Sequence, residues 1–252
     1  MKKTFLTVLF ISTLLLVQYP SYSNPTQANT YKDPYTISPQ ILPSDTTKPR
    51  PYIYNPNYRA TNTHLIDILH TNLYVKPIWD SSTLIGKAEI FLKPYFYPTT
   101  QINLNARGMQ LNTIQLQELP SKNKIPFTYT YQNDSIKIQL PQPITSTQTL
   151  QITINYIAQP EKINTKGSAA IQSDKGLYFI NPKGEIAGKM PQIWTQGETQ
   201  SNSVWFPTND SPNEKMTHDI YITVDKKYTT LSNGLLIESI SNKDGTKTDH
   251  WK

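Results

Sequence analysis

The segment Leu150-Gln151-Ile152-Thr153-Ile154-Asn155-Tyr156 alternates apolar and polar side chains at every position. Successive side chains of a β-strand point to opposite faces, so this period of two predicts a strand with one buried face. The same alternation recurs in four other segments, at 87–93, 101–104, 135–140 and 218–224. Thr, Ile and Tyr are frequent in these runs, as is typical of strands. After the N-terminal 23 residues, no stretch of 12 residues shows a convincing helical period.

Turn-forming residues separate these segments. Asn233-Gly234 lies between Thr230-Leu231-Ser232 and Leu235-Leu236-Ile237, where it predicts a type I′ hairpin turn. Asp244-Gly245 predicts a second hairpin between Ile240-Ser241 and the run that begins at Thr246. Short strands with such turns between them predict an all-β domain, a sandwich or saddle of antiparallel sheets.

The N-terminus has the pattern of a secretory signal peptide. Lys2 and Lys3 precede an apolar run, Phe5 to Val17, and Ser21-Tyr22-Ser23 offers a small-x-small cleavage site. We therefore predict a signal peptide over residues 1–23 and export to the periplasm or the cell exterior; an uncleaved anchor is the alternative. No later segment is long and apolar enough to span a membrane, so none is expected after cleavage.

Composition excludes several classes of function. The chain has no cysteine, which rules out disulfides, thiolate zinc sites and a cysteine nucleophile. Its net charge is +6, and loss of Lys2 and Lys3 with the signal peptide lowers it to +4. The basic residues are scattered, whereas a nucleic-acid groove needs clustered Lys and Arg, so no nucleic-acid partner is expected.

The chain divides into three parts by composition. After residues 1–23, residues 24–62 are rich in Pro, Tyr, Asn and Thr, and we expect an extended lead-in because proline disfavours helix. Residues 63–252 carry the strand pattern and form the predicted β-domain.

Two neighbouring polar residues could bind an ammonium group. Gln196 and Glu198 are separated by one glycine, and in an extended segment residues i and i+2 point to the same side. A carboxylate and a carboxamide would then project together. An ordinary solvent-facing Gln/Glu pair is the alternative that spacing alone favours.

A second constellation is Trp205-Phe206-Pro207 followed by Asp210, Pro212 and Lys215. We interpret it as a buried aromatic corner in which Asp210 caps a turn and Lys215 forms a surface salt bridge.

The four histidines do not form a recognisable metal motif. His64 and His70 are six residues apart in a strand-like run, so they would share a face but lie about 20 Å apart. They cannot chelate one ion, and no catalytic or metal-binding residue is predicted in this chain.

Several short motifs follow one another along residues 63–252. They are, in order, His64-Leu65-Ile66-Asp67-Ile68, Leu84-Ile85-Gly86, Gly176-Leu177-Tyr178, Thr195-Gln196-Gly197-Glu198, Trp205-Phe206-Pro207 with Asp210, Pro212 and Lys215, Leu231-Ser232-Asn233-Gly234, and Asp249-His250-Trp251-Lys252. In this order they make residues 63–252 resemble the N-terminal domain of the zinc aminopeptidase N family, a gluzincin family that includes the leukotriene hydrolases. Thr208 stands where that family usually has Cys.

The resemblance implies a β-saddle that packs on a thermolysin-like catalytic domain, in cis or in trans, with Zn in a full-length parent enzyme. It also implies that Gln196 and Glu198 bind the α-ammonium of a peptide N-terminus. The family's Gly-x-Met-Glu-Asn loop, its His-Glu-x-x-His zinc motif and its transition-state Tyr are missing from this sequence, so we expect no hydrolysis by this chain alone. The alternative is a stand-alone exported β-domain that binds peptides or glycans, with Trp194, Trp205 and Trp251 as stacking surfaces.

Overall fold

A computed structural model describes residues 63–164 and 173–252, which lie within the unit formed by Ala60–Lys252. The predicted signal peptide (1–23) and lead-in (24–62) lie outside the described residues. Within them, no helix has the length and apolar character needed to cross a membrane.

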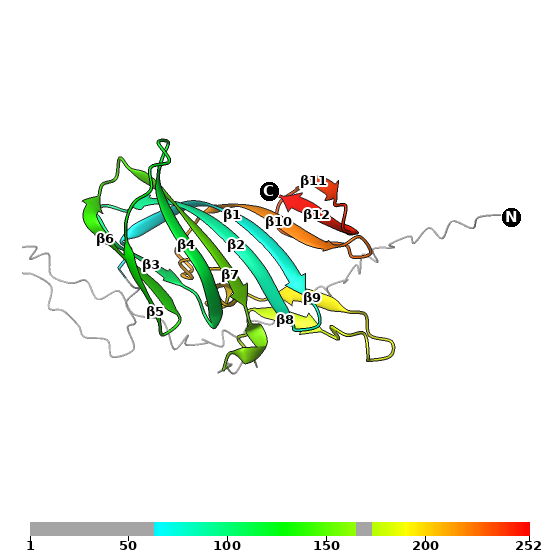
Figure 1. Cartoon of the computed structure of the whole chain (residues 1–252). Coiled ribbons are helices and arrows are strands. Elements are labelled where there is room, and N and C mark those ends of the chain that lie inside the picture. Colours follow the sequence, from blue (N-terminus) through cyan, green and yellow to red (C-terminus); the bar gives the residue numbers. More distant parts are fainter. Residues whose placement is uncertain (1–62, 165–172) are drawn as a thin grey trace, which may run out of the picture. The chain divides into compact units, whose positions relative to one another are not determined.

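The described residues form an all-β domain, as predicted; they make three sheets, of which the largest is mixed rather than wholly antiparallel, and the only helical elements among them are two single 3₁₀ turns (Figure 1). The 3₁₀ turns are η1 (Pro160–Lys162) and η2 (Asn202–Val204). The seven-stranded sheet has the order β11 (Leu236–Ser241), β12 (Thr246–Trp251), β10 (Thr217–Asp225), β1 (Ile66–Ile78), β2 (Thr83–Pro94), β7 (Thr149–Ala158), β4 (Met109–Leu119). The three-stranded sheet has the order β3 (Thr99–Asn105), β6 (Ser135–Ile144), β5 (Thr128–Gln132), and the two-stranded sheet pairs β8 (Leu177–Ile180) with β9 (Gln192–Thr195).

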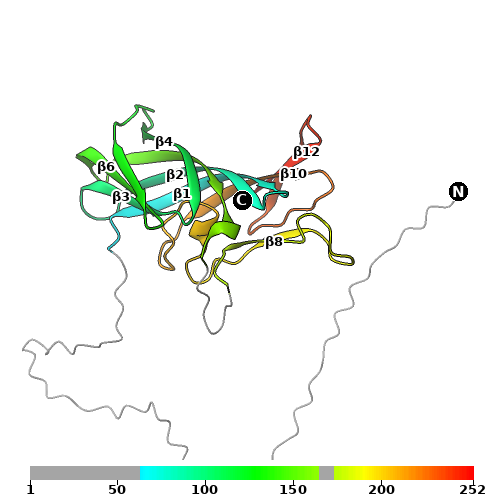
Figure 2. The same ribbon diagram turned by 60° about the horizontal axis from the view of Figure 1, so that its bottom comes forward.

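The core lies between the two larger sheets. Ile152 and Ile154 of β7 and Ile136 and Ile138 of β6 are buried in one hydrophobic cluster, because period-two strands turn their apolar residues inward. The three-stranded sheet covers the β4 end of the large sheet, whereas the β8–β9 hairpin lies below its central part, where β1 and β10 pair (Figures 1 and 2). The five segments with strict alternation are all strands, which confirms that part of the prediction.

One strand departs from simple alternation. In β1, Ile68 is buried, but after a bulge at Leu69 it is Thr71 and Leu73 that are buried. A bulge inserts one residue and reverses the faces of those that follow. His70 therefore lies on the outer face, and the expectation that His64 and His70 share a face was wrong.

The two predicted hairpin turns have different outcomes. Asp244-Gly245 does join β11 to the antiparallel β12, with Gly245 at φ +85°. Asn233-Gly234 does not form a type I′ hairpin, because only Gly234 has a positive φ and Leu235 bonds to Lys252 rather than to residues 230–232. The close approach of Gly234 to the Lys252 carbonyl is what requires glycine there.

Candidate functional site

The predicted pair Gln196 and Glu198 lies on the loop that follows β9. Gln196 Nε2 donates to Glu198 Oε2 at 3.3 Å, so the two side chains do project together. The pair lies just after β9, which ends at Thr195, and the turn that follows begins at Glu198. Glu198 is exposed, and among the described residues no Lys, Arg or His nitrogen lies within salt-bridge distance of its carboxylate.

The loop is held at both ends by backbone hydrogen bonds. The Gln196 amide donates to the Gly176 carbonyl, and the Ser201 amide donates to the Gly197 carbonyl, each at 2.9 Å. A Cβ on Gly197 would lie 2.4–2.7 Å from the Asn202 side chain, closer than real Cβ atoms approach. Glycine at 197 therefore lets the loop pack directly against η2, which restricts where Glu198 can point.

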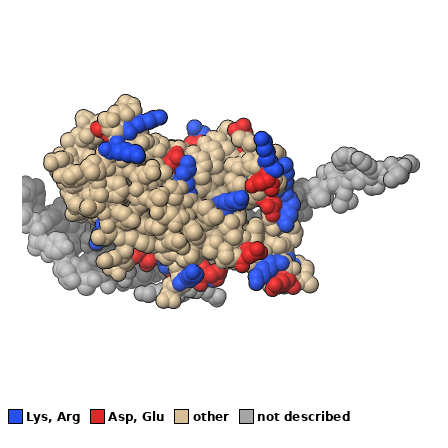
Figure 3. Space-filling model, in the orientation of Figure 1, with Lys and Arg blue, Asp and Glu red and all other residues tan. Residues whose placement is uncertain are grey.

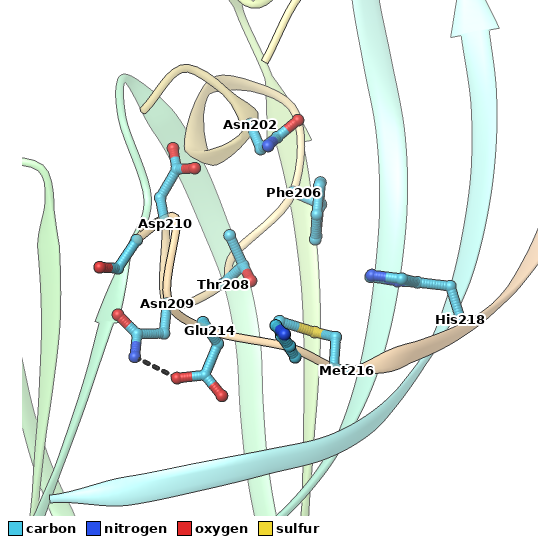
Figure 4. A pocket seen from close by; sticks show the side chains of 10 residues that line it. Asn202, Phe206, Thr208, Asn209, Asp210, Glu214, Met216 and His218 are labelled. Atoms are coloured by element: carbon cyan, nitrogen blue, oxygen red, sulfur yellow. Dashed lines mark hydrogen bonds between the residues drawn. The ribbon is translucent and has the colours of Figure 1, made fainter. Parts of the chain in front are cut away.

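Two carboxylates anchor the segment that follows the loop. Asp210 Oδ2 accepts from the Ser203 amide at 2.8 Å, and this cap is buried. Glu214 Oε1 accepts from the Ile68 amide at 3.1 Å, and Oε2 accepts from Asn209 Nδ2 at 2.5 Å (Figure 4). Both carboxylates thus serve structural roles: Asp210 ties its segment to η2, and Glu214 ties it to β1.

The aromatic corner predicted at Trp205-Phe206-Pro207 is present. Phe206 and Pro207 are buried, and Asp210 caps a turn as expected. Lys215 is exposed, but none of the described carboxylates forms an ion pair with it, so that part of the prediction was wrong. A pocket of about 290 Å³ adjoins this segment and is lined mainly by polar residues, among them Asn202, Asp210 and Glu214 (Figure 4).

A larger cavity of about 890 Å³ lies between the β1–β10 part of the large sheet and the β8–β9 hairpin. Apolar side chains from both layers line it, and Trp79, Trp205, Phe206 and Tyr228 add aromatic surface. Thr195, which precedes Gln196, and Asn202, which contacts Gly197, also line it. The Gln196–Glu198 loop therefore begins and ends at the margin of an apolar cavity.

Two residues that line this cavity carry buried polar atoms with no hydrogen-bond partner among the described residues, Trp205 Nε1 and His218 Nδ1. An unpaired buried polar group costs about 1–3 kcal/mol. Burial, together with the nearby His70, lowers the pKa of His218 below its ordinary value of 6.5, so its imidazole is neutral at pH 7. Sequence patterns did not single out this pair.

The three tryptophans proposed as stacking surfaces differ in exposure. Trp194 is 47% exposed and stacks on Tyr178, with ring centroids 4.6 Å apart. Trp251 is buried, and its Nε1 donates to Thr230. Only Trp194 is thus available as an exposed aromatic platform, since Trp205 is half-buried.

The described residues do not fit a zinc ion. No group of three or more His, Asp or Glu side chains in residues 63–164 and 173–252 is arranged to hold a metal. His64 lies 3.7 Å from Glu214, whereas His70 contacts Thr217 and Asp219, so the two histidines serve separate networks.

Sequence analysis missed a charged network on the outer face of the large sheet. Asp219 is buried and lies 2.5 Å from His250 Nε2 and 3.3 Å from His70 Nε2. The rings of Tyr74, Tyr221 and His250 stack in sequence across β1, β10 and β12. Pairing between distant strands creates this network, which joins the last strand to the centre of the sheet.

Charges on the visible surface are mixed in sign. On the face shown in Figure 3, basic and acidic side chains are interspersed, and much of the face carries neither. Among the described residues, Lys87 pairs with Glu89 and Lys93 with Asp67.

Similar proteins share this domain. The chain is 25% identical over 203 residues to transcription initiation factor TFIID subunit 2 of Drosophila melanogaster, a match that covers 69% of this chain and 16% of that protein. The corresponding protein of Gallus gallus is 34% identical over 83 residues, covering 32% of this chain and 7% of that protein. The chain therefore spans under a fifth of the length of these relatives.

Solved structures show the same fold. An M1 zinc metallopeptidase from Deinococcus radiodurans matches with a TM-score of 0.58 and 17% identity over 75% of this chain and 39% of that chain. A two-domain M1 zinc metallopeptidase bound to L-arginine matches with a TM-score of 0.59 and 18% identity over 74% of this chain and 38% of that chain. The model of the peptidase M1 N-terminal domain matches residues 50–252. This chain therefore belongs to the peptidase M1 N-terminal domain family.

Proposed function

We propose that this chain is the substrate-recognising N-terminal domain of an exported zinc aminopeptidase, and that Gln196 and Glu198 bind the α-ammonium of a peptide. The observation that carries the proposal is the Glu198 carboxylate, which contacts the Gln196 amide and has no cationic partner among the described residues. The loop that bears it is pinned at both ends by backbone hydrogen bonds.

An ammonium group suits this pair chemically. It offers three donors, while the Glu198 carboxylate and the Gln196 carbonyl oxygen both accept hydrogen bonds. A charge-assisted hydrogen bond is about twice as strong as a neutral one. When a docked catalytic domain excludes water, the attraction strengthens further and fixes the first peptide bond in position.

Zinc chemistry would come from a thermolysin-like catalytic domain, in the same polypeptide or in another. That ion would activate water and polarise the scissile carbonyl. This chain would contribute amine recognition, and the apolar cavity beside the loop offers a surface for the catalytic domain. Export is proposed from the pattern of residues 1–23.

Calorimetry of short peptides binding to the purified chain tests the proposal. A tripeptide amide with a free N-terminus should bind saturably, and its N-acetylated form should bind at least about tenfold more weakly, because one charged hydrogen bond contributes about 1.5–3 kcal/mol. Glu198→Gln should weaken binding of the free peptide to a similar degree. Glu185→Gln, a change at another exposed Glu, is the matched control. Equal affinity for both peptides, or no effect of Glu198→Gln, would contradict the proposal.

A second candidate is a stand-alone domain that binds peptides or glycans. Trp194 favours it, because its ring is exposed and held flat against Tyr178. Binding that survives N-acetylation but is lost in Trp194→Ala would support this candidate over the first.

A further inference from the structure

One face of the β8–β9 hairpin carries an aromatic pair beside the loop that bears Gln196 and Glu198 (Figure 1). Tyr178 and Trp194 are directly opposed in the antiparallel pairing, and their rings stack with centroids 4.6 Å apart and planes 17° apart. Tyr178 Oη donates to the Ser173 carbonyl at 2.6 Å, which anchors one ring of the pair. The hairpin therefore holds the Trp194 ring in a defined orientation.

Trp194 is stacked on one face of its ring only. It is 47% exposed, whereas Leu177 and Phe179, on the opposite face of β8, are buried in the core. Because Trp194 stacks on a residue of the neighbouring strand, the second face of its ring points away from β8. Among the described residues, no other aromatic ring and no Lys or Arg cation is in contact with Trp194.

The proposed ammonium pair continues along the same face of the hairpin. The Gln196 amide donates to the Gly176 carbonyl at 2.9 Å, which extends the pairing of β8 and β9 by one residue on each strand. Residues i and i+2 of an extended segment point to the same side, with about 7 Å between them. Trp194 and Gln196 are therefore neighbours on one face, and Gln196 Nε2 in turn donates to Glu198 at 3.3 Å.

The orientation of the Trp194 ring indicates what it can bind. Gln196 follows along the strand, whereas the ring faces point across it, so the edge of the ring is turned toward Gln196. The edge of an aromatic ring is electropositive, which makes Trp194 poorly placed for a cation–π contact with the ammonium group itself. A flat, uncharged side chain on the second face would instead gain offset stacking.

An aromatic N-terminal residue meets both requirements in one group. Its ring is joined to the carbon that bears the ammonium by a single CH₂ group, so ring and ammonium occupy adjacent positions. The ammonium would accept the carboxylate of Glu198 as its partner, and the ring would lie against Trp194.

We propose that the second face of Trp194 binds the side chain of the N-terminal residue and favours peptides in which that residue is aromatic. The inference rests on the proposed function, because it takes the ammonium group to lie on Gln196 and Glu198. It adds a side-chain preference, which the amine pair alone does not provide.

Calorimetry of three tripeptide amides with the purified chain tests this preference. Phe-Gly-Gly amide and Leu-Gly-Gly amide both begin with a large apolar residue, but only the first has a ring. An aromatic pair strengthens binding about two- to tenfold beyond the effect of the area it buries, so the Phe peptide should bind more tightly than the Leu peptide by about that factor. The third peptide, N-acetyl-Phe-Gly-Gly amide, should bind at least about tenfold more weakly than its free form.

Substitutions at Trp194 assign the preference to its ring. In Trp194→Leu, the Phe and Leu peptides should bind with equal affinity, whereas Trp194→Phe should keep the preference for the Phe peptide. Tyr97→Leu removes a ring that is 82% exposed and lies outside the hairpin, and it should leave the preference unchanged. None of the three changes should alter the loss of affinity that N-acetylation causes.

The outcomes separate this inference from the proposed function. Equal binding of the Phe and Leu peptides to the unmodified chain, or a preference that persists in Trp194→Leu, would overturn the aromatic site, while a remaining effect of N-acetylation would leave the amine pair intact. Binding that is insensitive to N-acetylation, or no binding of any peptide, would refute the amine pair and this inference together.

Discussion

Gly86, near the start of β2, makes space for the largest fully buried side chain among the described residues. Tyr156 of β7 lies directly opposite Gly86 in the antiparallel pairing and is fully buried. A Cβ on residue 86 would lie 2.1 Å from Cζ, 2.4 Å from the hydroxyl oxygen and 2.6 Å from Cε1 of the tyrosine. The phenol ring therefore covers the glycine, and Gly86→Ala inserts a methyl group into occupied space.

The expected cost follows from two opposing effects. Overpacking a closed core costs about 1–3 kcal/mol, and three ring atoms in conflict place this site near the top of that range. Alanine in a strand recovers up to about 1 kcal/mol relative to glycine. The net loss should be about 2 kcal/mol of unfolding free energy, which for a domain of this size lowers Tm by about 4–8 °C.

Urea denaturation followed by circular dichroism measures this loss directly. Ile85→Ala, at the exposed neighbouring position, is a control for the effect of alanine in the same strand without contact to the core. If Gly86→Ala changed the unfolding free energy by less than about 0.5 kcal/mol, the ring would be free to move aside, and the close packing inferred here would be wrong.

Three further changes test other parts of the structure. Tyr156→Phe should stabilise the domain by about 1 kcal/mol in the same denaturation assay, because the buried hydroxyl has no hydrogen-bond partner among the described residues; a loss of stability would reveal a hidden partner. Glu214→Gln should lower the unfolding free energy by about 1–3 kcal/mol, because an NH₂ group replaces one of the two oxygens that accept hydrogen bonds from Ile68 and Asn209. The control Glu185→Gln should leave the unfolding free energy unchanged. Burial opposes ionisation of Asp219, but the His250 hydrogen bond and the charges of Lys252, His250 and His70 lower its pKa below the ordinary 3.8. The ionised Asp219 therefore contributes fully to the unfolding free energy above about pH 4, and this contribution is lost as the pH falls through the pKa that Asp219 has in the folded domain. In Asp219→Asn, the unfolding free energy should no longer show this loss in acid.

The strand pattern was predictable because alternation is a local property of the chain. The runs around Lys87, Ile136, Ile152 and Ile220 each show which face is buried without reference to any other segment. The Asp244-Gly245 turn was predictable for the same reason, since a tight turn depends on its own two residues.

Two of the predictions that failed depended on contacts between distant segments. The bulge at Leu69 reversed the faces of β1, and bonding of Leu235 to Lys252 replaced the hairpin expected at Asn233. The parallel pairing of β1 with β10 joins segments some 150 residues apart, and no local pattern encodes it.

The sequence by itself determined the all-β class, the position of most strands and, through ordered motifs, the family and the pair Gln196 and Glu198. Only the tertiary structure decided that the loop bearing this pair bonds to Gly176 and packs on η2, beside an apolar cavity. It also decided that Asp219 lies within ion-pair distance of both His70 and His250. The physical reason is that side-chain periodicity is local, whereas strand order and bulges arise only when distant segments satisfy one another's backbone hydrogen bonds.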